Sequence, residues 1–367
     1  MVSIKDVAEA AGVSTATVSR VLSNGLHVRP EVRERVLATV ERLGYRPNLV
    51  ARSLRSQQSS TIGLIVSDIS NPFFTAISRA VEDTAYEQGF SVLLCNTDEN
   101  PEKEAIYLNL MRDTAVAGAI ISPTRQTIAS LADSNLPFPI VVIDRSISNG
   151  DVDSVLIDNV DAAYRLITHL IEQGYRRIGA LCSEMSTGLE RQLGYEKALR
   201  ARGFAPQSEY MKYVSPKAEA GYEATLKMLD LTEPPDALFA VNSLIAEGAL
   251  QAIRERNLTI PDDIALVSFD ETPWTSIVQP AITLIAQPTY EIGESAADLL
   301  IKRIADPSRP TRKVILNGQL LVRGSSSPRL RSDHAEVASQ IASLKTNRTN
   351  DRQHNTVEDS PGKKGCG

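Results

Sequence analysis

The sequence predicts an α/β protein, in which a head of short helices precedes a core of two doubly wound parallel-sheet subdomains. Its 367 residues exceed one ordinary domain. From Thr61 onward, short β-branched apolar runs alternate with amphipathic segments, as in parallel sheets covered by helices on both faces. The charge is also divided, because residues 1–60 hold nine Lys/Arg and five Asp/Glu, whereas the remainder holds thirty and forty. A basic head therefore precedes an acidic body.

The head is predicted to form short helices. Gly12 ends the first helix, since glycine commonly follows the last helical residue, and Ser14 caps the second. Pro30 stands where a third helix begins, and Gly44 follows its last apolar residue. The predicted helices are 4–11, 15–22, 30–43 and 48–55, and the polar run 56–60 is interpreted as a linker.

Strands and helices alternate in the body. The first series has strands 62–67, 91–96, 117–122 and 140–144 with helices 74–88 and 102–112. The second has strands 177–182, 238–242 and 264–269 with helices 162–173, 189–202, 222–229 and 246–256. These are too many strands for one sheet, so two subdomains are predicted, the second beginning near Asn159. We expect the later helix 290–304 and strand 314–316 to complete the first.

Several classes of protein are excluded by what the chain lacks. No window approaches 18 uninterrupted apolar residues, which excludes a membrane span. The first residues lack the basic start and apolar run of a secretory signal, so a cytoplasmic protein is expected. Cys95, Cys182 and Cys366 are too scattered for a disulfide framework or a metal cluster. Residues beyond 328 turn polar, and disorder is expected there.

Enzymatic motifs are missing as well. The chain has no G-x-G-x-x-G, P-loop, G-x-S-x-G or H-E-x-x-H sequence. Its four histidines have no nucleophile partner in the sequence. We therefore expect no catalytic residues, no metal and no cofactor.

Segment 4–22 has the spacing of a helix-turn-helix, with Gly12 in the tight turn. In that motif the second helix enters the major groove and its first residues contact base edges. Hydroxyls can bond phosphates or bases, and an arginine can bond guanine with two hydrogen bonds. The candidate DNA contacts are Ser14, Thr15, Ala16, Thr17, Ser19 and Arg20. The alternative is a capped helix that only faces solvent.

Three blocks in order resemble the DNA-binding head of the lactose repressor (LacI/GalR) family: IKDVAEAAGVSTATVSRVLS, HV with RPEVRERV, and LGYRPNLVARSLR. The similarity extends to about residue 328. It implies a helix-turn-helix head over 1–47, a hinge helix and linker over 48–60, and an effector-binding core over 61–328 before a polar tail, 329–367. Subdomain one would span about 61–158 and 288–318, and subdomain two about 159–287.

In that family the hinge helix folds on operator DNA and inserts a leucine into the minor groove. By position this leucine is Leu54; the alternative is that it packs against the core. An apolar wedge unstacks one base step, and the bend is repaid by added contact. The further DNA-contact candidates that the resemblance implies are His27, Asn48, Ala51, Arg52 and Arg55. Because paired heads read a palindrome, a homodimer is expected.

Polar and aromatic residues follow the predicted strands, where ligands of such folds bind. In order, they resemble the ligand set of the periplasmic ribose-binding protein, a fold relative of the family's core. The resemblance implies hydroxyl-bonding roles for Asn71, Asn100, Asp144, Arg145, Arg191, Asn242, Asp270 and Gln287, and ring packing by Phe73, Phe74 and Phe269. One aromatic has no clear counterpart; Tyr222 and Lys217 are candidates. Trp274 either walls the pocket or fills the core.

The charges of this set favour a neutral polyol, because two Asp and two Arg nearly cancel. A ribose-like pentose is the first choice; a sugar acid or another sugar is the second. As alternatives, Asp144 and Arg145 could form an internal ion pair and Phe74 could be core. The family resemblance thus implies a repressor of a sugar uptake or catabolism operon, controlled allosterically through closure at crossovers near Asp158, Gln287 and Gln319. The rival is a cytoplasmic sugar-binding or sugar-processing protein without DNA function.

Overall fold

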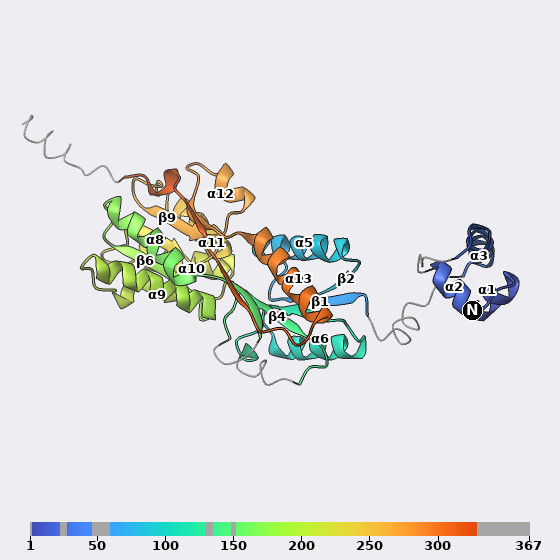
Figure 1. The fold of residues 1–367 in the computed structure, drawn as a ribbon. Coiled ribbons are helices and arrows are strands. Elements are labelled where there is room, and N and C mark those ends of the chain that lie inside the picture. The colour runs from blue at the N-terminus through green and yellow to red at the C-terminus, as the bar shows by residue number, and fades with distance from the viewer. Residues whose placement is uncertain (1, 23–27, 46–58, 129–134, 148–151, 329–367) are drawn as a thin grey trace, which may run out of the picture.

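The computed structural model describes residues 2–22, 28–45, 59–128, 135–147 and 152–328. It has a helical head and a core of two six-stranded sheets with helices packed on them (Figure 1). This is the α/β class that the sequence predicts. The candidate DNA contacts His27, Asn48, Ala51, Arg52, Leu54 and Arg55 lie outside the described residues, as does the tail 329–367.

The head contains α1 (Ile4–Ala10), α2 (Thr15–Leu22) and α3 (Pro30–Leu43). Apolar side chains of all three helices meet in a small core that includes the fully buried Val7, Val18 and Val36. Gly12 has a φ of +62°, a left-handed conformation that glycine adopts without steric cost. Its N–H donates to Glu9 O over 3.1 Å, so the predicted tight turn between the first two helices is confirmed.

The first sheet is entirely parallel, in the order β11-β5-β4-β3-β1-β2. Its strands are β1 (Thr61–Val66), β2 (Ser91–Asn96), β3 (Ala119–Ile121), β4 (Ile140–Ile143), β5 (Asp153–Ile157) and β11 (Lys313–Leu316). Helices α5 (Pro72–Glu87) and α13 (Thr289–Ala305) cover one face, and α6 (Pro101–Asp113) covers the other (Figure 1). We call this sheet and its helices the first subdomain.

The second sheet has the order β12-β10-β9-β8-β6-β7, with β12 antiparallel to β10 and the other pairs parallel. Its strands are β6 (Ile178–Cys182), β7 (Met211–Tyr213), β8 (Ala237–Ala240), β9 (Ala265–Phe269), β10 (Thr283–Ala286) and β12 (Gln319–Leu321). Its helices are α8 (Asn159–Glu172), α9 (Ser186–Ala201), α10 (Ala218–Leu229), α11 (Ser243–Glu255) and α12 (Pro273–Ile277). We call this unit the second subdomain.

Close helix packing in the second subdomain depends on Gly248. A Cβ at this position of α11 would lie 1.9 Å from the carbonyl oxygen of Ala218 in α10. Only a residue without a side chain allows this approach. The fully buried Tyr195 and Phe239 stack at 6.3 Å between ring centroids, and they place an aromatic layer in the same core.

Four strands were not predicted from the sequence, namely β5, β7, β10 and β12. Strands β7 (MKY) and β12 (QLL) have three residues each and include a polar residue, and β10 (TLIA) has four and begins with one. Strand β5 begins with the polar, buried Asp153. Arg303 pairs with this carboxylate at 3.0 Å and the Arg312 N–H donates to it over 2.7 Å. Because its charge is paired, Asp153 is tolerated inside the sheet.

The chain crosses between the subdomains three times. The crossings follow β5 at Asp158, β10 near Gln287 and β11 at Gly318. The first and third lie together, because the Asp158 N–H donates to Leu316 O over 3.3 Å and the Arg165 side chain donates to Gly318 O over 2.7 Å. Parallel connecting strands of this kind can act as a hinge.

Among the residues that the structure describes, none of the helices combines the length and the apolarity that crossing a membrane requires.

Candidate functional site

A cavity of about 520 Å³ lies between the two subdomains. Its walls are formed largely by residues that directly follow strands: Ser67 after β1, Asp144 after β4, Ser183 after β6 and Asp270 after β9. The carboxyl ends of parallel strands are where open α/β sheets place their ligands. The volume falls within the ordinary range of small-molecule sites.

Nine of the predicted effector residues line this cavity: Asn71, Phe73, Phe74, Asp144, Arg145, Arg191, Asn242, Asp270 and Gln287. They come from both subdomains, so a molecule bound there would contact both. Phe73 and Phe74 also belong to the hydrophobic core, and they meet edge to face at 4.9 Å between ring centroids.

Asp270 is buried, and the side chain of Asp144 is only 10% exposed. Each has a positive φ, 67° for Asp144 and 71° for Asp270. This backbone conformation is strained for a residue other than glycine, and such residues cluster at functional sites. Burial raises the pKa of Asp144 to about 6, although Arg145 and Arg191 act in the opposite direction. Burial likewise raises the pKa of Asp270, and Arg191 and a hydrogen bond from Gln287 oppose this shift.

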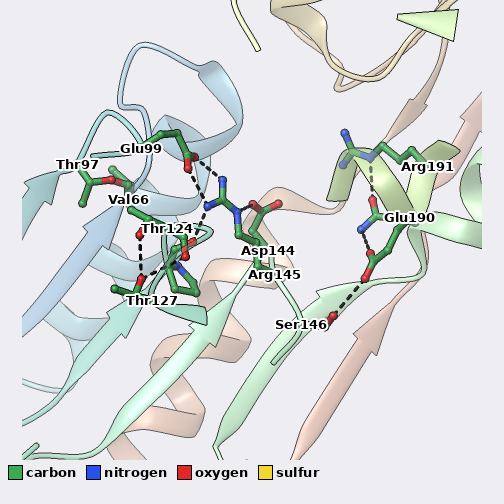
Figure 2. A network of polar contacts seen from close by, with 12 residues as sticks. Val66, Thr97, Glu99, Thr124, Thr127, Asp144, Arg145, Ser146, Glu190 and Arg191 are labelled. Carbon is green, nitrogen blue, oxygen red and sulfur yellow. Dashed lines mark hydrogen bonds and ion pairs between the residues drawn. The ribbon is translucent and has the colours of Figure 1, made fainter. Parts of the chain in front are cut away.

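Arg145 is held by an internal ion pair. Its guanidinium group donates two hydrogen bonds to the carboxylate of Glu99 and one to Pro123 O, and it lies 3.5 Å from an oxygen of Asp144 (Figure 2). Its side chain is only 4% exposed. The ion-pair alternative is therefore what the structure shows, and most of the donors of Arg145 are already used.

Arg191 projects from α9. Its Nε donates to Asn159 Oδ1 over 2.8 Å, and Nη1 donates to Val241 O. The guanidinium carbon lies 4.0 Å from the centroid of the Phe269 ring, a cation–π contact. Phe269 is fully buried, and its ring packs against the guanidinium group of Arg191. The expectation that Phe269 packs on a ligand is therefore corrected.

Asparagines cap three helices that start at the cavity or near it. Asn71 Oδ1 accepts from Phe73 N at 3.0 Å and Asn242 Oδ1 accepts from Ile245 N at 2.8 Å. Because the oxygens are engaged, the amide NH₂ groups are what these two residues offer a ligand. Asn100 caps α6 in the same way but does not line the cavity, which corrects its predicted role.

Two further expectations are corrected by packing. Trp274, in α12, packs against the hydrophobic core and does not line the cavity, so the core-filling alternative holds. The Tyr222 hydroxyl donates a hydrogen bond to the Glu255 carboxylate over 2.6 Å, and Tyr222 does not line the cavity. Lys217 does line the cavity.

The sequence-based reasoning missed four acidic residues of the wall, Asp68, Asp98, Glu99 and Glu184. Three of them pair with cations, since Asp98 pairs with Lys103, Glu99 with Arg145 and Glu184 with Arg125, and Asp68 accepts hydrogen bonds from the N–H and hydroxyl of Ser70. All four lie in segments that follow a strand, which is the signal that could have identified them. With Asp144 and Asp270, the wall carries six acidic residues against Arg145, Arg191 and Lys217. Lys103 and Arg125 pair with two of these carboxylates from outside the wall, so six carboxyl groups meet five cations and the charge is nearly balanced, with a slight acidic excess.

In the head, α2 has two distinct faces. Ser14, Thr15, Ala16, Ser19 and Arg20 are exposed, and Val18 and Val21 face the core. Thr17 is half-buried: its N–H donates to Ser14 Oγ over 3.2 Å, and its hydroxyl lies 2.9 Å from the same oxygen. The hydroxyl of Thr17 thus takes part in capping the helix.

Both parts of the chain match models of known families. Residues 3–48 match the family described as bacterial regulatory proteins, lacI family. Residues 59–322 match periplasmic binding proteins and sugar binding domain of LacI family. The two matches leave residues 49–58 between them.

Individual relatives agree. The HTH-type transcriptional repressor PurR of Mannheimia succiniciproducens is 34% identical over 329 residues, covering 89% of this chain and 98% of the relative. The lac repressor dimer bound to operator and the anti-inducer ONPF superposes with a TM-score of 0.81 at 27% identity, covering 89% of this chain and 99% of that one. A LacI family regulator from Enterococcus faecium with bound ribose gives a TM-score of 0.65 at 28% identity, covering 73% and 99%. The chain therefore belongs to the LacI family of bacterial regulatory proteins, as a DNA-binding transcriptional repressor.

Proposed function

We propose that this repressor controls a sugar uptake or catabolism operon in the cytoplasm, and that a small sugar bound between the subdomains sets its affinity for operator DNA. A ribose-like pentose is the first choice of effector, and a sugar acid or another sugar is the second. The observation that carries the proposal is the pair of largely buried carboxyl groups, Asp144 and Asp270, which face one cavity from different subdomains.

The chemistry of the wall favours a polyol. Carboxylates accept hydrogen bonds from adjacent hydroxyls, and the amide NH₂ groups of Asn71 and Asn242 donate to hydroxyl or ring oxygens. Phe73 and Phe74 offer apolar surface to the C–H faces of a ring. The slight excess of acidic residues disfavours an anion, so a sugar acid ranks below a neutral sugar. The ribose-bound relative supports a pentose.

The coupling would act through the three crossings. A ligand that hydrogen-bonds to Asp144 in the first subdomain and to Arg191 in the second favours the arrangement of the subdomains in which it can contact both residues at once. This bias is worth about 1–3 kcal/mol in typical allosteric proteins, and it acts equally on effector and operator affinity. In a homodimer, the same movement would change the separation of the two heads on a palindromic operator.

The DNA contacts remain proposals. Ser14, Thr15, Ala16, Ser19 and Arg20 would face the major groove, because they share the exposed face of α2. The hinge candidates, with Leu54 as the minor-groove wedge, follow from the family resemblance.

Calorimetry with D-ribose, other pentoses, hexoses, sugar acids and purines tests the effector, and a gel shift with DNA upstream of the gene tests the operator. We expect D-ribose or a close pentose to bind, and the same sugar to change operator affinity by about 5- to 150-fold. D270A is the control, because it should lose sugar binding and keep operator binding. If no sugar of the panel binds, or if binding leaves operator affinity unchanged, the proposal is wrong.

A further inference from the structure

Among the described residues, two side-chain hydrogen bonds run from the first subdomain to the second, in addition to a hydrophobic cluster that includes residues of both. Arg125 Nη1 donates to Glu184 over 2.8 Å, but these side chains are 61% and 67% exposed. An exposed ion pair contributes little, because water screens it and two long side chains must be ordered. The other contact is half-buried: Ser146 Oγ donates to Glu190 Oε1 over 3.2 Å. This second contact is the stronger candidate for holding the subdomains in a fixed arrangement.

Glu190 is also joined to the hinge. Its other oxygen, Oε2, accepts from Asn159 Nδ2 over 2.8 Å (Figure 2). Asn159 is the first residue of α8, directly after the crossing at Asp158, and it is only 2% exposed. One carboxylate thus connects the first subdomain to the first crossing.

The same carboxylate fixes the orientation of the Asn159 amide. An ionised carboxylate can only accept hydrogen bonds, so the Asn159 atom facing it must be the NH₂ group. Asn159 Oδ1 then faces the opposite way, where it accepts from Arg191 Nε over 2.8 Å. Arg191 Nε–H is itself a donor and also requires Oδ1, so Glu190 and Arg191 hold the amide in the same orientation, and among the described contacts Glu190 supplies the acceptor for its NH₂ group.

The other end of the connection lies beside the first carboxyl group of the cavity. Ser146 comes two residues after Asp144, in the segment that follows β4. A movement of that segment toward or away from α9 therefore changes the Ser146–Glu190 contact directly.

We propose that Glu190 is a positioning residue that links effector contact to the arrangement of the subdomains. It orients Arg191 through Asn159 and holds the Asp144 segment through Ser146. The link to an effector rests on the proposed function, whereas the link between the subdomains does not.

Three substitutions separate these roles. E190Q keeps the shape and can keep both contacts, because its Oε1 can accept from Asn159 while its NH₂ group donates to the Ser146 hydroxyl, so it serves as the conservative variant. E190A removes both bonds, and S146A removes only the bond between subdomains. E196Q is the matched control, because Glu196 lies on the same helix and bonds only Gln192 and Arg200 within it among its described contacts.

Spin labels measure the arrangement without any ligand or DNA. Cysteines would replace Glu82 on α5 and Lys227 on α10, both exposed, in a C366S background where Cys95 and Cys182 are buried. Unlabelled chains in excess restrict the signal to distances within one chain. We expect one narrow distance distribution for the parent, E190Q and E196Q, and a broadened or displaced one for E190A and S146A. An unchanged distribution in both E190A and S146A would overturn the proposal.

Calorimetry with D-ribose tests the orientation of Arg191. E190A should weaken D-ribose binding by about 2- to 30-fold, the range in which single positions modulate coupling. S146A should weaken it less, because the Glu190–Asn159 bond remains. D-ribose affinity of E190A equal to that of the parent would contradict the positioning role. If the parent binds neither sugar nor DNA, the proposed function fails, and the spin-label distances still decide this inference.

Discussion

Asp144 and Asp270 occupy equivalent places in the two subdomains. Each directly follows the third strand of its sheet order, β4 and β9, and each has a positive φ. Each N–H also donates to the neighbouring strand, from Asp144 to Val155 O at 3.3 Å and from Asp270 to Ile285 O at 3.0 Å. Each subdomain thus presents to the cavity the carboxyl group of an aspartate whose backbone is strained.

Sugar binding should depend on pH through Asp144, whose pKa is raised to about 6. Below pH 6 the free protein holds a proton on this carboxyl, and a protonated carboxyl accepts hydroxyl donors less well. D-ribose affinity should therefore fall as the pH drops below about 6, by at most tenfold per pH unit for one group, and level off above it. Calorimetry between pH 4.5 and 8 measures this. D144N should lose the part of the dependence that Asp144 contributes and keep any part from Asp270, whose pKa burial also raises; an affinity that rises toward low pH would contradict the account.

Removing the charge of Asp144 should stabilise the ligand-free protein. The folded-state pKa lies above the unfolded value, so the folded protein holds the extra proton between about pH 4 and 6, and the free energy of unfolding falls as the pH rises through that window. A shift of this size corresponds to roughly 3 kcal/mol above pH 6. D144N should recover up to that amount in urea unfolding at pH 7.5. The control is E172Q, at an exposed pair with Arg202. A D144N protein less stable than the parent would refute this.

Arg20 should read a base in the major groove. It is exposed near the end of α2, and arginine bonds guanine O6 and N7 together. R20A should weaken operator binding by about 10- to 100-fold and relax the sequence preference at one position. R200A, on helix α9 of the second subdomain, should do neither. Gel shifts on operators with single base changes measure both effects. A uniform loss over all sequences would instead indicate a phosphate contact.

Leu54 lies outside the described residues, and its role as a wedge stays a prediction. An apolar wedge acts only where the duplex bends on a specific site. L54A should therefore weaken specific binding far more than non-specific binding. Titrations with operator and with random DNA at the same salt concentration compare the two. Equal losses for both DNAs would argue for packing against the core.

Local chemistry made much of this fold predictable. Gly12, Pro30 and Gly44 mark helix ends at the level of single residues, and the apolar runs of β1 and β9 are long enough to indicate buried strands. The strands that escaped prediction are short, or they begin with a residue such as Asp153, whose burial depends on Arg303 far along the chain. No local pattern contains that partner.

The sequence predicted those site residues whose position depends on following a strand. It did not predict those whose side-chain orientation depends on packing. Asp144 and Asp270 follow strands and line the cavity. Phe269 is the last residue of its strand, yet its ring turns beneath Arg191, and Asn100 is used to cap α6. Which way such a side chain faces depends on neighbours from other elements, and the sequence of one strand does not contain them.

The most direct test of the account is the operator affinity of the parent protein with and without D-ribose at pH 7.5 and constant salt. The account predicts a change of about 5- to 150-fold, matched by an equal change in D-ribose affinity when operator is present. Operator affinity that is identical at saturating D-ribose, for a protein that calorimetry shows to bind this sugar, would contradict it.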